Sequence, residues 1–83
     1  ILRNNYAYYL TLQNKELEKA EKLSKYTIEK EKKNYIYLDT YAYIMFKLNQ
    51  LEKAKYFIKK AIKYGGKSNK EIVDYYELIM NKN

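Results

Sequence analysis

The sequence contains neither cysteine nor histidine. Without thiols the chain can form no disulfide framework and no cysteine redox site, and without imidazole it lacks the commonest general base and metal ligand. Proline is also absent and glycine occurs only twice, a composition typical of a soluble and almost entirely helical domain. No apolar run approaches the roughly 20 residues that span a bilayer, and no signal peptide is visible. We therefore expect a non-enzymatic domain with no catalytic residue, metal site or cofactor and no membrane insertion.

Two stretches of the chain recur. Residues 5–8 (NYAY) return as residues 40–43 (TYAY), and residues 17–20 (LEKA) return unchanged as residues 51–54. The offset of about 34 to 35 residues is typical of a helical repeat array. Because the chain begins without methionine and ends within a repeat, we expect it to be part of a longer protein. We predict a single domain over 1–83, with units at about 1–34, 35–68 and a partial unit at 69–83.

The recurring residues are those of a tetratricopeptide (TPR) repeat, and the chain resembles that family along nearly its whole length. In the second unit, the large–small pair Tyr41-Ala42 is followed by Ala54 and Ala61, small residues where two helix axes would cross closely. The resemblance implies an all-α fold, in which antiparallel helix-turn-helix repeats stack as a short right-handed TPR solenoid of about five helices. Pentatricopeptide repeats have a similar period, but their second helix usually carries a bulky residue where this chain has Thr27 and Ala61.

The other units depart from the pattern in places. The first unit has Ser24 and Thr27 at positions that are apolar or small in the second. Asn14 and Asn49 replace the glycine of the family's turn, and asparagine tolerates the left-handed backbone conformation that such a turn needs. In the third unit Tyr76 stands where a small residue is expected, which suggests that the last helix caps the array.

Helix ends are marked by capping and turn residues. Asn34 precedes the third apolar stripe as an N-cap, Gly65-Gly66 supplies a left-handed stop, and Ser68 and Glu71 have the spacing of a capping box. Between these signals, apolar residues recur at helical spacing. The helices are predicted near residues 2–13, 16–31, 35–48, 51–64 and 69–80.

In TPR proteins the first helix of each unit lines the concave side of the array. On the side opposite their core-facing stripe, these helices carry aromatic and mixed-polar side chains, which suit an extended or helical peptide. The resemblance therefore implies a non-catalytic scaffold that binds a protein or peptide partner through this face. The residues expected to contact the partner are Asn4, Tyr8, Thr11, Asp39, Tyr43, Phe46, Lys47 and Glu77. In an alternative interpretation, the aromatic members of this set pack against neighbouring repeats or against segments outside this chain.

The net charge of +7 suggests a second hypothesis, a basic helical-repeat module that binds RNA or another nucleic acid. Residues 35–68 contain seven lysines and two acids. However, Arg3 is the only arginine, and a chain so poor in arginine is badly equipped for bidentate readout of phosphates or bases. Lysine, tyrosine, asparagine and isoleucine all have A/T-rich codons, so genome composition also accounts for much of the charge.

A third hypothesis is self-association. The repeat array is open at Ile1-Leu2 and around Tyr75, Tyr76 and Ile79, and like ends can stack into a dimer. The near-identical repeat copies resemble those of TPR proteins in the bacterial cell envelope. Both that compartment and the cytoplasm fit the sequence, which leaves the localisation open.

Overall fold

The structure is a computed structural model that describes residues 2–82, with side chains from residue 3 onward. Within these residues it is all helical, with five α-helices, a short 3-10 helix and no strand. The elements are α1 (Leu2–Leu12), α2 (Leu17–Lys30), α3 (Tyr35–Lys47), α4 (Leu51–Lys63), the 3-10 helix η1 (Gly66–Ser68) and α5 (Lys70–Met80). The predicted all-α fold is confirmed, and each predicted helix end lies within one residue of the observed end.

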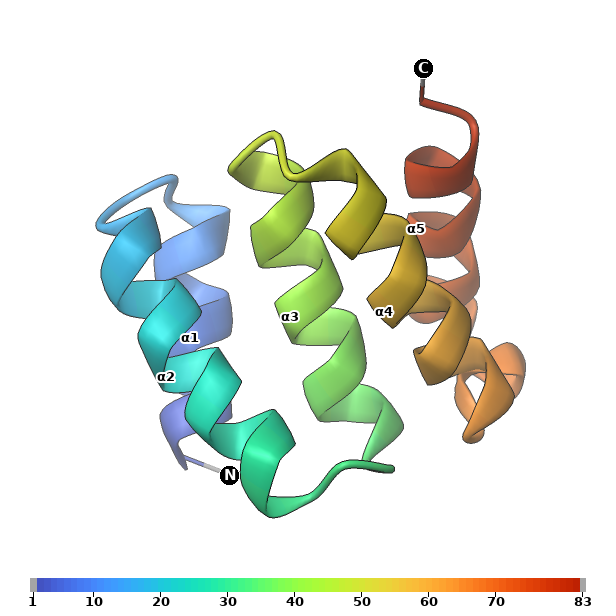
Figure 1. Cartoon of the computed structure of the whole chain (residues 1–83), viewed down its shortest axis with the longest axis horizontal. Helices are drawn as coiled ribbons and strands as arrows, with labels where there is room; N and C mark the ends of the chain where they lie inside the picture. Colours follow the sequence, from blue (N-terminus) through green and yellow to red (C-terminus); the bar gives the residue numbers. More distant parts are fainter. Residues whose placement is uncertain (1, 83) are drawn as a thin grey trace.

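The helices form consecutive antiparallel pairs around α3 (Figure 1). Each helix packs against the next along the chain, and α3 also packs against α1 and α5. The backbones of α1 and α5 do not contact each other within the described residues. The Cα radius of gyration is 11.2 Å, close to the roughly 12 Å expected for a globular domain of this length. The short array is therefore as compact as a helical bundle, with α3 at its centre.

The two helical hairpins close with the same turn. Asn14 after α1 has φ 57° and Asn49 after α3 has φ 61°, which confirms the left-handed conformation predicted for both asparagines. In the first turn the backbone N–H of Lys15 donates to the Leu10 carbonyl at 2.9 Å, and in the second the N–H of Gln50 donates to the Met45 carbonyl at 2.8 Å. These are the long bonds of a Schellman motif, which satisfies carbonyls that a helix end leaves free.

Two N-caps and one glycine set the remaining helix ends. Asn34 caps α3 as predicted, since its Oδ1 accepts from the N–H of Ile36 at 3.0 Å and of Tyr37 at 3.2 Å. Gly65 follows α4 with φ 129°, a region that favours glycine. A Cβ on Gly66 would lie 2.7 Å from the Ala61 carbonyl oxygen, so this position has no room for a side chain.

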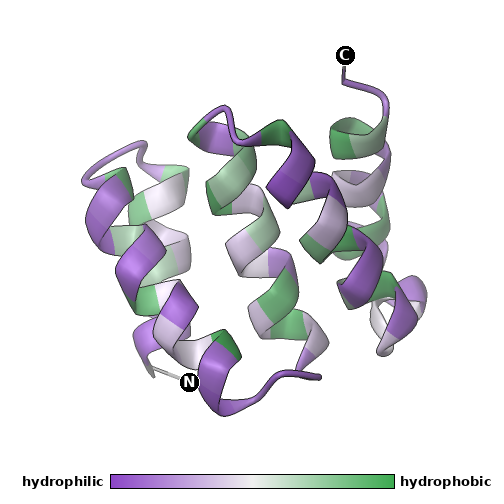
Figure 2. Ribbon diagram, in the orientation of Figure 1, coloured by the Kyte–Doolittle hydropathy of each residue, from purple (hydrophilic) through white to green (hydrophobic). Residues whose placement is uncertain are grey.

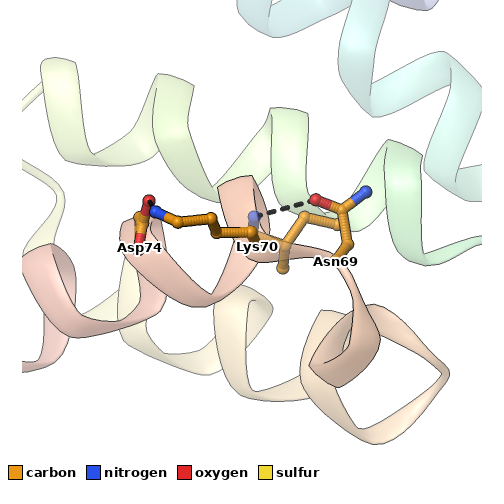
Figure 3. A network of polar contacts seen from close by, with 4 residues as sticks. Asn69, Lys70 and Asp74 are labelled. Atoms are coloured by element: carbon orange, nitrogen blue, oxygen red, sulfur yellow. Dashed lines mark hydrogen bonds and ion pairs between the residues drawn. The ribbon is translucent and has the colours of Figure 1, made fainter.

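The capping box predicted at Ser68 and Glu71 is wrong. Ser68 ends the 3-10 helix η1, and its Oγ donates to the Gly65 carbonyl at 3.3 Å. Because this extra turn precedes α5, the cap moves on to Asn69, whose Oδ1 accepts from the Ile72 N–H at 3.2 Å (Figure 3). The same view shows an exposed ion pair between Lys70 and Asp74 at 2.9 Å, a kind that adds little stability.

Small residues lie at the helix crossings, as the repeat pattern predicted. Ala42, Ala54 and Ala61 are 0% exposed, so a larger side chain at any of them would push two helices apart. Tyr76 is partly buried against the core. Ile79 is 0% exposed, so the expectation that the last helix presents it to another copy is wrong, and Ile1 lies outside the described residues.

The outer helices α2 and α4 carry most of the hydrophilic surface. Figure 2 shows their solvent side as strongly hydrophilic, whereas α3 between them is paler and greener. No helix in residues 2–82 combines the length and the apolar character needed to cross a membrane. The face formed by α1, α3 and α5 differs from this polar surface and positions the residues described next.

Candidate binding surface on α1, α3 and α5

Four aromatic side chains meet on the face shared by α1, α3 and α5, and we call them the aromatic cluster: Tyr8, Tyr43, Phe46 and Tyr75. Tyr43 lies at the centre, with its ring stacked on Tyr75 at a centroid distance of 4.5 Å. Tyr8 lies 6.4 Å from Tyr43, and Phe46 lies 6.5 Å from it on the other side. One aromatic surface therefore joins the three helices.

The hydroxyls of Tyr8 and Tyr75 lie 2.7 Å apart and share a hydrogen bond. This bond links α1 to α5 even though the two backbones do not touch. All four members of the cluster are only partly buried. The cluster thus packs like core on its inner side and remains open to a partner on its outer side.

Asp39 lies on α3 one turn before Tyr43 and is 5% exposed. Its Oδ1 has no hydrogen-bond partner, and the ion pair that residues 3–82 form, Lys70–Asp74, does not involve it. Burial, and to a smaller extent the charge of Glu71 on α5, raises the pKa of Asp39 from 3.8 to about 7. A buried carboxyl without a basic partner is uncommon, because taking an ionised carboxylate out of water is unfavourable.

The tyrosines at this face also lie in a negative environment. Burial is the main cause that raises the pKa of Tyr8, followed by its hydrogen bond to Tyr75 and by the charge of Glu71. The pKa of Tyr75 is likewise raised mainly by burial, then by Glu71, Tyr43 and Asp39. Both carboxyl groups therefore disfavour ionisation of the phenols at this face.

The structure brings together only some of the predicted partner-binding residues. Tyr8, Tyr43 and Phe46 meet in the aromatic cluster, and Lys47 and Glu77 are exposed. The expectation that Asn4, Thr11 and Asp39 are exposed is wrong, since they are 3%, 0% and 5% exposed.

The physical reason is the close packing of α1 and α5 on α3, which covers positions that a wider array would leave open. Thr11 turns inward and its Oγ1 donates to the Ala7 carbonyl of its own helix at 2.7 Å. Sequence reasoning missed Tyr75 and Glu71. The repeat register gave Tyr75 the core position of Tyr41, and no feature of the sequence marked it as a partner of Tyr8.

A cleft of about 490 Å³ adjoins the aromatic cluster at the end of α3. Phe46 belongs to both regions, and Lys47 connects them, because it lines the cleft and its Nζ lies 5.6 Å from the centroid of the Tyr43 ring. The cleft is lined by Phe46, Lys47, Asn49, Leu51 and Lys82. Its mixed lining extends the aromatic surface toward the α3–α4 turn and the end of the chain.

None of the family models, curated proteins and solved structures compared with this chain matches it. Within the described residues, no three Asp or Glu side chains gather in a way that would hold a metal ion.

Proposed function

We propose that the chain is a TPR-like helical-repeat module that binds a protein or peptide partner, without catalysis, through the face formed by α1, α3 and α5. The observation that carries the proposal is the partly exposed aromatic cluster across three helices. Tyrosine and phenylalanine give a large contact area while little side-chain entropy is lost, and they dominate the energetics of many interfaces. Here the rings already hold one another in place, so a partner would not have to order them.

The surroundings of the cluster support a peptide more than a flat protein surface. The 490 Å³ cleft at Phe46 gives room for a side chain of the partner. Lys47 and Glu77 are exposed near the ends of α3 and α5, where opposite charges can fix the direction of a bound segment. The bound peptide would thus contact all three helices. The aromatic contacts would supply affinity, and the charges would fix the register of the peptide.

The test is a double substitution, Tyr43→Ala with Phe46→Ala. Both side chains are partly exposed, so we expect helicity to be retained while partner binding falls by about 100-fold or more, as for the loss of two interface anchors. The purified chain would select binders from a library of 12-residue peptides, and calorimetry would compare them on the parent and the variant. A matched control is Tyr56→Ala, which removes an exposed aromatic ring from α4.

Unfolding of the double variant would show that these rings serve the fold, and the binding assignment would then be wrong. Equal binding by parent and variant would also refute it. Circular dichroism before each binding measurement separates the two results, because only the first changes the helical signal.

A second candidate function is nucleic-acid binding by α4. Tyr56 is 57% exposed, and the Nζ of Lys60 lies 5.0 Å from its ring centroid. An exposed ring among lysines suits stacking on a base beside a phosphate. Binding of a single-stranded oligonucleotide that falls steeply between ~0.15 M and ~1 M salt, and falls further in Tyr56→Ala, would favour this function.

A further inference from the structure

The α1, α3 and α5 face carries a pattern that repeats on all three helices. Each helix places an oxygen-bearing side chain four residues before a tyrosine of the aromatic cluster: Asn4 before Tyr8, Asp39 before Tyr43, and Glu71 before Tyr75. Residues four apart lie on the same side of a helix, one turn from each other. Since the three helices run in the same direction (Figure 1), the face has a tier of three tyrosines next to a tier of three oxygen acceptors.

Two of the three acceptors are not satisfied by the chain itself. Asn4 Oδ1 and Asp39 Oδ1 are both buried and have no hydrogen-bond partner, in residues that are 3% and 5% exposed. No lysine or arginine among residues 3–82 forms an ion pair with Asp39 or Glu71. Buried polar atoms are nearly always paired, so two unpaired acceptors leave negative charge on this face that the chain does not compensate.

Two carboxyl groups, Asp39 and Glu71, act on this face in a chain whose net charge is +7. The lysines concentrate on the outer helices, above all on α4, and at physiological salt a charge is screened beyond about 8 Å. The local carboxyl groups therefore determine what approaches the face. The rings of the cluster can attract a cation, since the Nζ of Lys47 lies 5.6 Å from the centroid of the Tyr43 ring.

We propose that the aromatic cluster, with Asn4, Asp39 and Glu71, recognises a basic side chain of the bound peptide, with arginine preferred over lysine. This inference rests on the proposed function and names the chemistry of the partner. The guanidinium is planar, so it can stack on a tyrosine ring while its N–H groups donate to a carboxylate. Asn4 Oδ1 and Asp39 Oδ1 are themselves covered, so they act on the cation through their full or partial negative charge, while the exposed Glu71 carboxylate can accept its N–H groups.

The binding should depend on pH through Asp39. The titratable groups that act on this carboxyl are Glu71 and Tyr75, both on α5. Burial raises the pKa of Asp39 to about 7, so the carboxyl is protonated at pH 5.5 and ionised at pH 8. A bound cation favours the ionised form, and affinity therefore increases with pH across this range.

The test is a titration of the full ¹⁵N-labelled chain with three capped tripeptides, Gly-Arg-Gly, Gly-Lys-Gly and Gly-citrulline-Gly. Citrulline has the shape of arginine without its charge. We expect the arginine peptide to bind at least ~10-fold more tightly than the citrulline peptide, with amide shifts on α1, α3 and α5. Asp39→Asn should lower its affinity by ~10-fold and remove most of the pH dependence. Glu52→Gln, the same change at an exposed site on α4, should leave both unchanged.

Equal binding of the arginine and citrulline peptides, or no shift with either at ~20 mM, would overturn cation recognition. The proposed function would survive that result if library peptides bound the parent chain and lost affinity in Tyr43→Ala/Phe46→Ala. Conversely, arginine binding that the double variant does not weaken would place the cation site elsewhere and overturn the inference. A shift pattern confined to α4 would assign the binding to another surface and overturn the inference.

Discussion

The hairpins α1–α2 and α3–α4 are built on one backbone plan but bury different chemistry. Both close with a Schellman turn at an asparagine and cross at fully buried alanines, Ala20 in the first and Ala54 in the second. The first hairpin then buries Ser24 where the second buries Ile58, and both residues are 0% exposed. The turns and small residues that the hairpins share specify the repeat geometry, whereas the residues that differ determine how much each hairpin contributes to stability.

The same comparison applies to the binding face. Asn4 and Asp39 occupy equivalent positions in the first and second repeats, and both are buried with an unpartnered Oδ1. Of the two, only Asp39 can carry a charge, so in this pair of positions it is the second repeat whose stability should respond to pH. Substitutions that make one hairpin resemble the other separate these contributions.

The largest effect is expected from Ile58→Ser, which gives the second hairpin the residue of the first. Ile58 is fully buried in the core cluster. Its loss removes apolar contacts, leaves a cavity and buries a hydroxyl, which together cost about 4 kcal/mol. Urea denaturation followed by circular dichroism measures the loss. Ile58→Val is the control, with an expected cost of about 1 kcal/mol. A cost below about 1 kcal/mol for the serine variant would mean that serine and isoleucine at this position stabilise a hairpin about equally.

Asp39→Asn gives the second repeat the side-chain chemistry of the first and should stabilise the chain in a pH-dependent way. The pKa of Asp39 is raised from 3.8 to about 7 by folding. The native state therefore holds this proton more tightly than the unfolded state, and the contribution of Asp39 to stability decreases as the pH rises from about 4 to about 7. The variant should be more stable than the parent by up to about 4 kcal/mol at pH 8 and nearly equal to it near pH 4.

Denaturation curves of both proteins at pH 4, 6 and 8 measure this difference. In Glu52→Gln, an exposed site, the difference from the parent should stay small at each pH. A constant difference between Asp39→Asn and the parent would mean that the carboxyl titrates normally in the folded chain. Its burial would then place no constraint on the binding face.

Much of the fold was predictable because repeats, caps and small residues are local signals. The helix ends, the left-handed asparagines and the buried alanines were all read from spacing in the sequence, and the structure confirms them. The cap at Asn69 was missed because η1 adds a turn that depends on the two glycines and on the packing of Ile72 beneath them.

The candidate site was less predictable because it depends on contacts between distant helices. The sequence indicated which helices form the face but not how closely α1 and α5 approach over α3. That approach buries Asn4, Thr11 and Asp39 and brings Tyr75 to Tyr8, two residues separated by 67 positions. No local periodicity encodes a contact of this range, so the charge of the face emerged only from the packed structure.

The smallest effect is expected from Ser24→Ala, which makes the first hairpin more like the apolar second. The Ser24 hydroxyl is buried and has no hydrogen-bond partner, while the Ser24 carbonyl accepts from Thr27 Oγ1 at 2.7 Å and is untouched by the substitution. Removing an unsatisfied hydroxyl without changing the backbone should stabilise the chain by up to about 1 kcal/mol. Thr27→Ala is the matched comparison: it removes a hydroxyl that is hydrogen-bonded and should destabilise the chain by a similar amount. If both substitutions destabilised the chain equally, the Ser24 hydroxyl would have a partner in solution, and the polar core of the first hairpin would be as well satisfied as the apolar core of the second.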